Sequence, residues 1–210
     1  MFYQILVYDV NILCYNTGVM DYSVIFVAGP QGCGKGTQGK KLAQRLGFFF
    51  WGMGGILRKI AEADTPLAKK IAPSLVDGNL LDDQTIIDVL ASQIPAIPAE
   101  QGIVFDGVPR RIGQADFLIP YLRSHGRGRM ATIFIDLPRE ESMKRLTVRA
   151  KNEDRKDDTP EGIENRFRFY DEFIKPTEEY LRKETTFIEV DGRPGVEEIS
   201  AEISKALGIG

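Results

Sequence analysis

The stretch Gly29-Pro30-Gln31-Gly32-Cys33-Gly34-Lys35-Gly36-Thr37 decides the fold, because it lies between a predicted strand and a predicted helix. Residues 23–28 form a short apolar run rich in β-branched side chains, which is typical of a buried parallel strand. Residues 35–46 predict a helix that ends at Gly47. Glycines in such a turn let backbone N–H groups surround an anion at the positive end of the helix dipole. We therefore predict a phosphate-binding loop, the P-loop, at residues 29–37.

Two side chains of the P-loop suit a nucleotide. Lys35 can reach the β- and γ-phosphates, and Thr37 can offer its hydroxyl to magnesium. The stretch departs from the strict G-x-x-x-x-G-K-[ST] pattern because Gly36 intervenes before Thr37. The alternative is a glycine-rich turn without a ligand, and the cluster of glycines around one lysine argues against it.

The rest of the chain alternates between strands and helices. Strands are predicted at 48–51, 102–105, 131–135 and 186–190, and helices at 138–151, from 159 onward with a kink at Pro176, and at 196–207. Residues 54–94 have a helical pattern with breaks near 65–66 and 77–78. This alternation predicts an α/β fold with a parallel sheet covered on both faces. Ligands of such sheets bind beyond the carboxyl ends of the strands, where the P-loop and Asp106 lie.

Composition excludes several classes of protein. The 210 residues suit one domain, and a net charge of −3 argues against a general nucleic-acid binder. Two cysteines, Cys14 and Cys33, are too few for a disulfide framework or a four-cysteine zinc site, so we expect a cytoplasmic protein. No apolar run approaches the roughly 18 residues of a membrane-spanning helix. At a helix N-terminus the thiol pKa of Cys33 is expected to be lowered.

Several motifs resemble those of the adenylate kinase family, from about Tyr22 to Leu207. The P-loop with Gln38 resembles the family's phosphate loop, and Asp106-Gly107-Val108-Pro109-Arg110 with Gln114 resembles its Asp-Gly-Phe-Pro-Arg signature and base-reading glutamine. Leu57-Arg58 resembles the element that holds the acceptor phosphate, and the arginines near 145–166 resemble those around a short lid. The resemblance implies a P-loop kinase with a parallel five-stranded sheet flanked by helices. It also implies a helical insertion at about 53–81 that binds a nucleoside monophosphate (NMP), and a short lid at about 150–158.

The resemblance also implies the reaction, a reversible transfer of the terminal phosphate of ATP to AMP with Mg²⁺ present. The implied catalytic residues are Lys35, Arg110, Arg145, Arg149, Arg155 and Arg166. Those implied for ATP are Gly29, Gly32, Cys33, Gly34, Lys35, Gly36, Thr37, Arg149 and Glu189. Those implied for AMP are Met53, Arg58, Asn79, Leu80, Leu81, Gly107, Val108, Pro109, Arg110, Gln114, Arg155 and Arg166. Thr37, and Asp106 through water, are implied for the metal.

The chemistry of phosphoryl transfer explains why several positively charged side chains are expected in one site. Phosphoryl transfer brings many negative oxygens together, and the planar fork of arginine binds such oxygens in pairs. Arg145 and Arg149 are four residues apart on a predicted helix and therefore share one face. Any one of these arginines alone is best interpreted as a solvated surface charge. As a set that matches the family's spacing from the P-loop, they favour a role in phosphate binding.

The acceptor side departs from the family pattern. Where the family usually has Ser-Thr-Gly-Asp, this chain has Gly52-Met53-Gly54-Gly55. Met53 offers only a weak acceptor in place of a hydroxyl, and Gly55 removes a carboxylate. Gln114 favours AMP as the acceptor. The alternatives are a UMP/CMP kinase or another NMP kinase, and a low-activity nucleotide-binding regulatory paralogue.

The first residues stand outside the resemblance. The family's chains begin at the position of Met20, so residues 1–19 are either an extension or the product of an upstream start codon, and we favour the second. Residues 20–210 are expected to form a single nucleotide kinase domain. We expect its partners to be small nucleotides, without nucleic acid or membrane, and the protein to be a monomer.

Overall fold

Five parallel strands form one sheet in the order β2-β3-β1-β4-β5. The computed structural model describes residues 22–77, 81–152 and 160–209. The strands are β1 (Val24–Ala28), β2 (Phe49–Gly52), β3 (Ile103–Asp106), β4 (Met130–Asp136) and β5 (Thr186–Asp191). Each begins and ends within one residue of a predicted strand, so the parallel five-stranded sheet is confirmed.

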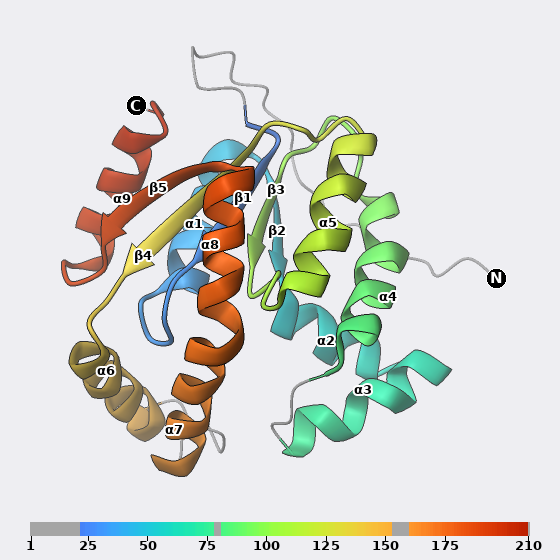
Figure 1. Cartoon of the computed structure of the whole chain (residues 1–210), viewed down its shortest axis with the longest axis horizontal. Coiled ribbons are helices and arrows are strands. Elements are labelled where there is room, and N and C mark those ends of the chain that lie inside the picture. The colour runs from blue at the N-terminus through green and yellow to red at the C-terminus, as the bar shows by residue number, and fades with distance from the viewer. Residues whose placement is uncertain (1–21, 78–80, 153–159, 210) are drawn as a thin grey trace.

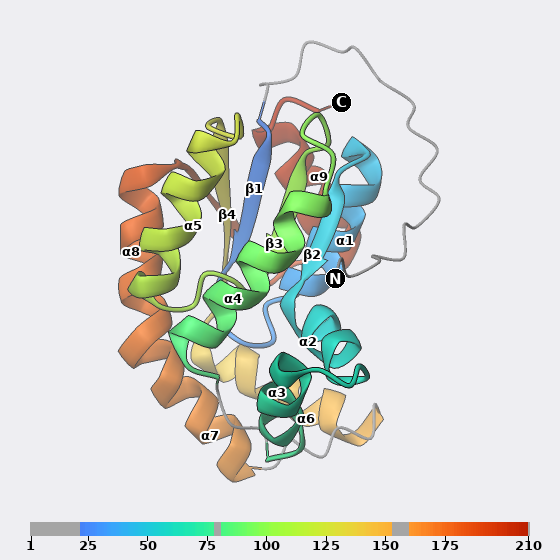
Figure 2. The same cartoon turned by 90° about the vertical axis from the view of Figure 1, so that its right-hand side faces the viewer.

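Helices cover both faces of the sheet, as Figure 2 shows. One face carries α1 (Lys35–Leu46) and α9 (Val196–Ala206), and the other carries α4 (Asp83–Gln93), α5 (Ile112–Ser124) and α8 (Lys175–Glu184). Side chains alternate along each strand, so β1 supplies Ile25 to the α1 side and Phe26 to the α5 side. Both core layers are closed to water, with Val24, Phe105 and Ile133 fully buried.

Two helical arms extend beyond the carboxyl ends of the strands, with the P-loop between them (Figure 1). One arm consists of α2 (Met53–Ala61) and α3 (Pro66–Asp77), which pack on each other. The other consists of α6 (Arg139–Asn152) and α7 (Pro160–Phe169), and α7 continues through a π-helical segment, Tyr170–Ile174, into α8. A short 3₁₀ turn, Ile94–Ala96, follows α4.

Two features of the helices differ from expectation. Helix α5 was not predicted, although Ala115, Leu118, Ile119 and Leu122 recur at helical spacing and are fully buried. The irregularity expected at Pro176 is a π-helical segment that ends just before it, with the proline in the first turn of α8. The π-helical turn and the proline thus adjoin each other, as is common where a long helix is irregular.

Some expectations fall outside the described residues. These are residues 1–19, most of the lid at about 150–158, and Thr159 as the start of α7. Within the described ranges, no helix is both long and apolar enough to cross a membrane.

Candidate functional site

The P-loop turns through three glycines with positive φ. Gly29, Gly32 and Gly34 have φ of 130°, 78° and 98°, in the region that side chains disfavour. A Cβ on Gly29 would lie 2.4 Å from the carbonyl oxygen of Ile135, so only glycine fits there. No side chain caps the N-terminus of α1. The first N–H groups of α1 therefore face the loop at the positive end of the helix dipole, an arrangement that suits a phosphate.

The ammonium group of Lys35 lies folded over this loop. Its Nζ donates to the carbonyl oxygens of Gly29 and Pro30, both at 2.7 Å. It is also 3.7 Å from the Sγ of Cys33. A nucleotide phosphate would offer Lys35 stronger, charge-assisted partners than these carbonyls.

The expected lowering of the Cys33 pKa is wrong. Burial raises the pKa of this thiol, since the residue has no exposed surface, and the nearby charge of Lys35 only partly opposes the effect. Desolvation therefore has a larger effect on the thiol pKa than the position at a helix N-terminus. The Cys33 side chain packs in the core on the α1 side of the sheet, and its backbone N–H donates to the carbonyl oxygen of Pro30 at 3.3 Å.

Asp106 lies at the end of β3, directly beside the P-loop. A Cβ on Gly36 would be 3.2 Å from its Oδ2, which places the carboxylate beside the residue that precedes Thr37. Burial raises the pKa of Asp106, and the charges of Lys35, Arg110 and Lys40 oppose this rise. A hydroxyl and a carboxylate suit Mg²⁺, which uses one or two protein oxygens together with phosphates and water. The described residues contain no cluster of three or more acidic, His or Cys side chains that could hold a metal without such help.

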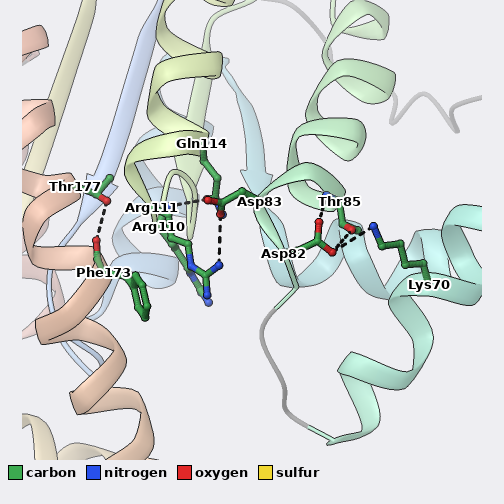
Figure 3. A network of polar contacts seen from close by, with 9 residues as sticks. All are labelled: Lys70, Asp82, Asp83, Thr85, Arg110, Arg111, Gln114, Phe173 and Thr177. Atoms are coloured by element: carbon green, nitrogen blue, oxygen red, sulfur yellow. Dashed lines mark hydrogen bonds and ion pairs between the residues drawn. The ribbon is translucent and has the colours of Figure 1, made fainter.

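Gln114 has a fixed side-chain orientation on the acceptor side (Figure 3). Its Oε1 accepts a hydrogen bond from the backbone N–H of Arg110, and its Nε2 donates to Oδ1 of Asp83, both at 2.9 Å. The N–H can only donate and a carboxylate at neutral pH can only accept, so these partners determine which way the amide points. One N–H and one lone pair of the amide remain for a base. Asp83 also pairs with Arg111 at 3.7 Å.

Arg111 links α5 to the opposite arm. Its guanidinium lies over the rings of Phe169 and Phe173, 5.4 and 4.6 Å from their centroids. Together with the Asp83 pair, this contact joins the N-terminal end of α4 to the helix that continues from α7. Planar stacking of this kind is characteristic of arginine.

Residues of the predicted acceptor site gather around Gly107. Its φ of 82° lets the Arg110 guanidinium fold back to 3.1 Å from where a Cβ would lie. Cβ of Met53 is 3.6 Å from the same point, and Met53 itself is buried. The Arg58 guanidinium lies over Gly54. Val108 and Pro109 are buried, and Leu81 packs against the core on the α5 side of the sheet.

The predicted arginines are partly brought together. Arg110 is exposed, and the charges of Asp106 and Arg166 lie close enough to act on its guanidinium. Like charges placed together this way favour a bound anion. Arg145 instead contacts Glu141 and donates to the carbonyl oxygen of Arg193 at 3.0 Å. Glu189 pairs with Arg182 on α8.

Four predicted residues cannot be placed in full. Arg149 lies on α6, one turn beyond Arg145, and its side chain is outside the described part of the structure. Asn79, Leu80 and Arg155 lie outside the described residues altogether.

A family model described as adenylate kinase matches residues 27–186, which is most of the chain. The protein belongs to the adenylate kinase family. It is 36% identical over 187 residues to an adenylate kinase of Thermus thermophilus, covering 89% of this chain and 97% of that protein. It is 34% identical to one of Maricaulis maris and 33% identical to one of Bacteroides fragilis, in each case over 183 residues, 87% of this chain and 97% of the relative. Membership of this family makes the chain a nucleotide-binding phosphotransferase of the NMP kinase type.

Three residues beside the candidate site were not found from the sequence. Asp83 orients Gln114, and its one local signal is an acidic residue in the first turn of a helix. The hydroxyl of Ser142 on α6 donates to the carbonyl oxygen of Gln31 in the P-loop. Glu178 on α8 contacts the P-loop from 149 residues away in the chain. No short-range pattern could have found the last two, because their roles depend on tertiary packing.

Proposed function

We propose that the protein is an ATP:AMP phosphotransferase, which reversibly transfers the terminal phosphate of ATP to AMP and forms two ADP. The observation that supports AMP as the acceptor is the oriented amide of Gln114, held between the Arg110 backbone and Asp83. With one N–H and one lone pair not used by these partners, the amide could match the donor and acceptor pattern of adenine. The position of Gln114 beside Arg110 would place a base next to a cation for its phosphate.

The ATP side follows from the P-loop. Backbone N–H groups of residues 29–37 and the N-terminus of α1 would bind the phosphates, and Lys35 would exchange its two carbonyl partners for phosphate oxygens. Thr37 and Asp106 would hold Mg²⁺, the latter through water, and the ion would neutralise phosphate charge and orient the terminal group. Arg149 and Glu189 stay proposed contacts of the adenosine of ATP.

The transferring phosphoryl group would lie between the P-loop and the Arg110 guanidinium. Catalysis of this reaction is mainly positioning and charge stabilisation, so the cations act by holding both nucleotides in line. We assign this role to Lys35, Arg110, Arg145, Arg149, Arg155 and Arg166. Closure of the arm α2–α3 and of the lid would exclude water, so that the nucleotide and not water accepts the phosphate.

The acceptor pocket leaves room for a different NMP. Met53 packs against Gly107 where a hydroxyl is usual in the family, and a Cβ on Gly55 would meet nothing within 4 Å. These two positions weaken the case for AMP and allow either a slower enzyme or another acceptor, so a UMP/CMP kinase or another NMP kinase is the first alternative. A low-activity nucleotide-binding paralogue is the second alternative.

A coupled assay of ADP release tests the proposal. ATP is offered with AMP, UMP, CMP and dGMP in turn, using the wild type, Lys35→Met and, as a matched control, Lys41→Met. Lys41 lies on the same helix but pairs with Glu197 at 2.9 Å. AMP should be the best acceptor, and Lys35→Met should lose roughly 10²–10³-fold in kcat, or about 2.7–4 kcal/mol. A pyrimidine preference would favour the first alternative, and ATP binding without turnover would favour the second.

A cytoplasmic location and a monomeric state complete the proposal, and both rest on the resemblance to the family. Its substrates would be free nucleotides, with no nucleic acid or membrane required. Sedimentation of the purified protein tests the monomer.

A further inference from the structure

A carboxyl group on α8 contacts the start of the P-loop. Glu178 is 6% exposed, and its Oε1 accepts a hydrogen bond from the backbone N–H of Gly29 at 3.1 Å. Its Oε2 accepts from the hydroxyl of Tyr170 at 2.7 Å. Gly29 is the residue whose carbonyl oxygen also binds Lys35. A chain of contacts thus runs from the π-helical segment through Glu178 and Gly29 to the ammonium group of Lys35.

Several charged or titratable groups face this carboxyl group. Lys35 approaches from the P-loop, Tyr170 from the π-helical segment and Lys175 from one turn earlier on α8. Cys33 and Asp136 lie close enough to act on Tyr170 in turn. Burial raises the pKa of Glu178 to about 7, although Tyr170, Lys35, Gly29 and Lys175 all favour its ionised form. The side chain therefore changes charge within the physiological range.

Solvent can exchange protons with this group. A cavity of about 440 Å³ between the sheet and α8 is lined by Pro30, Tyr170, Lys175 and Glu178, among others. The cavity borders the P-loop residue Pro30, so the same carboxyl group touches both the cavity and the loop. Protonation of Glu178 needs no opening of the core.

We propose that Glu178 is a positioning residue of the P-loop, which fixes Gly29 from α8 and whose negative charge competes with the phosphates of ATP for Lys35. This inference rests on the proposed binding of ATP at the P-loop. A carboxylate this close to the loop repels incoming phosphate and holds Lys35 by its charge. The protonated carboxyl group keeps its carbonyl oxygen for the N–H of Gly29 and can donate to Tyr170 instead.

Two consequences follow for nucleotide binding. ATP binds more tightly to the protein with protonated Glu178, so affinity falls as the pH rises through about 7. Binding near this pH also takes up protons, because the bound phosphates favour the neutral carboxyl group. Glu178→Gln is a permanent copy of the neutral form, since its amide can accept from Gly29 and donate to Tyr170.

The experiment measures binding of a non-hydrolysable ATP analogue with Mg²⁺ by calorimetry, from about pH 6 to about pH 8 and in two buffers of different ionisation enthalpy. The wild-type Kd should rise at least about fivefold more than that of Glu178→Gln across this range, the lower end of typical coupling between sites. Proton uptake near pH 7 should be seen in the wild type and lost in Glu178→Gln. The exposed neighbour Glu179 supplies the matched control, Glu179→Gln, which should behave as the wild type.

A third variant separates the contact from the charge. Glu178→Leu loses the partner of Gly29, so it should bind the analogue more weakly than Glu178→Gln at every pH, with KM for ATP raised more than kcat is lowered. Equal binding by the two variants overturns the positioning role. Equal pH dependence and proton uptake in the wild type and Glu178→Gln overturn the competition for Lys35. Normal binding without ADP formation in the wild type refutes the proposed reaction alone, and an absence of analogue binding refutes both proposals.

Discussion

Gly55 offers a direct test of how the arm α2–α3 is stabilised. It is the third residue of α2, a helix with no acidic residue in its first turn and no side-chain cap at Gly52. A Cβ on Gly55 would meet nothing within 4 Å, so a new side chain costs no packing. Replacing glycine within a helix recovers part of the roughly 0.5–1 kcal/mol that glycine costs. A negative charge at the helix N-terminus adds about 0.3–1 kcal/mol. Gly55→Asp should therefore stabilise the protein by about 1 kcal/mol.

Urea unfolding followed by circular dichroism measures this change, and thermal unfolding should show a rise of about 2–4 °C for a chain of this size. Gly55→Asn is the matched control, because it has the same shape without the charge. The advantage of Asp over Asn should disappear in about 1 M salt, where surface charges are screened. Equal stability of Asp and Asn variants at low salt would refute the role of the helix dipole here. A loss of stability in both would refute the open surroundings of Gly55.

Three other perturbations test the packing around the site. Gly29→Ala places a Cβ 2.4 Å from the carbonyl oxygen of Ile135, so urea unfolding should show a loss of at least about 1–3 kcal/mol; wild-type stability would contradict this geometry. Arg127 is 4% exposed and donates to the carbonyl oxygens of Ile97 and Pro98 at 3.1 and 2.6 Å, so Arg127→Met should cost about 1–3 kcal/mol in the same assay, and no loss would contradict it. Because burial raises the pKa of Glu178 from 4.5 to about 7, the native state binds this proton more tightly than the unfolded state. The free energy of unfolding of the wild type should therefore fall as the pH rises from about 4.5 to about 7, and level off above that. Over the same pH range the stability of Glu178→Gln should rise by about 3 kcal/mol relative to the wild type; parallel curves for the two proteins would rule this out.

Local patterns in the sequence predict much of this fold. The P-loop, the five strands and the helix from Lys35 to Leu46 depend on glycine placement and on short apolar runs, which are readable within about ten residues. The helix Ile112–Ser124 has the same kind of signal, although Pro120 lies within it, and it is not among the predicted helices. The sequence predicts a kink at Pro176, and the structure has a π-helical segment, Tyr170–Ile174, just before that residue.

The site itself was less predictable, because its side chains depend on partners far away in the chain. Gln114 is 31 residues from Asp83, and Gly29 is 149 residues from Glu178. Cys33 shows the same limit, since the rule for a helix N-terminus takes no account of a residue with no exposed surface. Burial and tertiary hydrogen bonds are properties of the packed chain, which spacing along the sequence does not encode.

The strand order of the sheet has a consequence for how freely the acceptor side can change. β1 lies between β3 and β4, so the P-loop, Asp106 and the beginning of α6 leave three adjacent strands, each about 4.8 Å from the next. Backbone hydrogen bonds of the sheet thus set the spacing of the groups that we propose to bind phosphate. The arm α2–α3 is inserted between β2 and β3, and its sequence does not enter that spacing. Under the proposed function, substitutions at Met53 and Gly55 would therefore alter which acceptor fits while the distance between Lys35 and Asp106 stays the same.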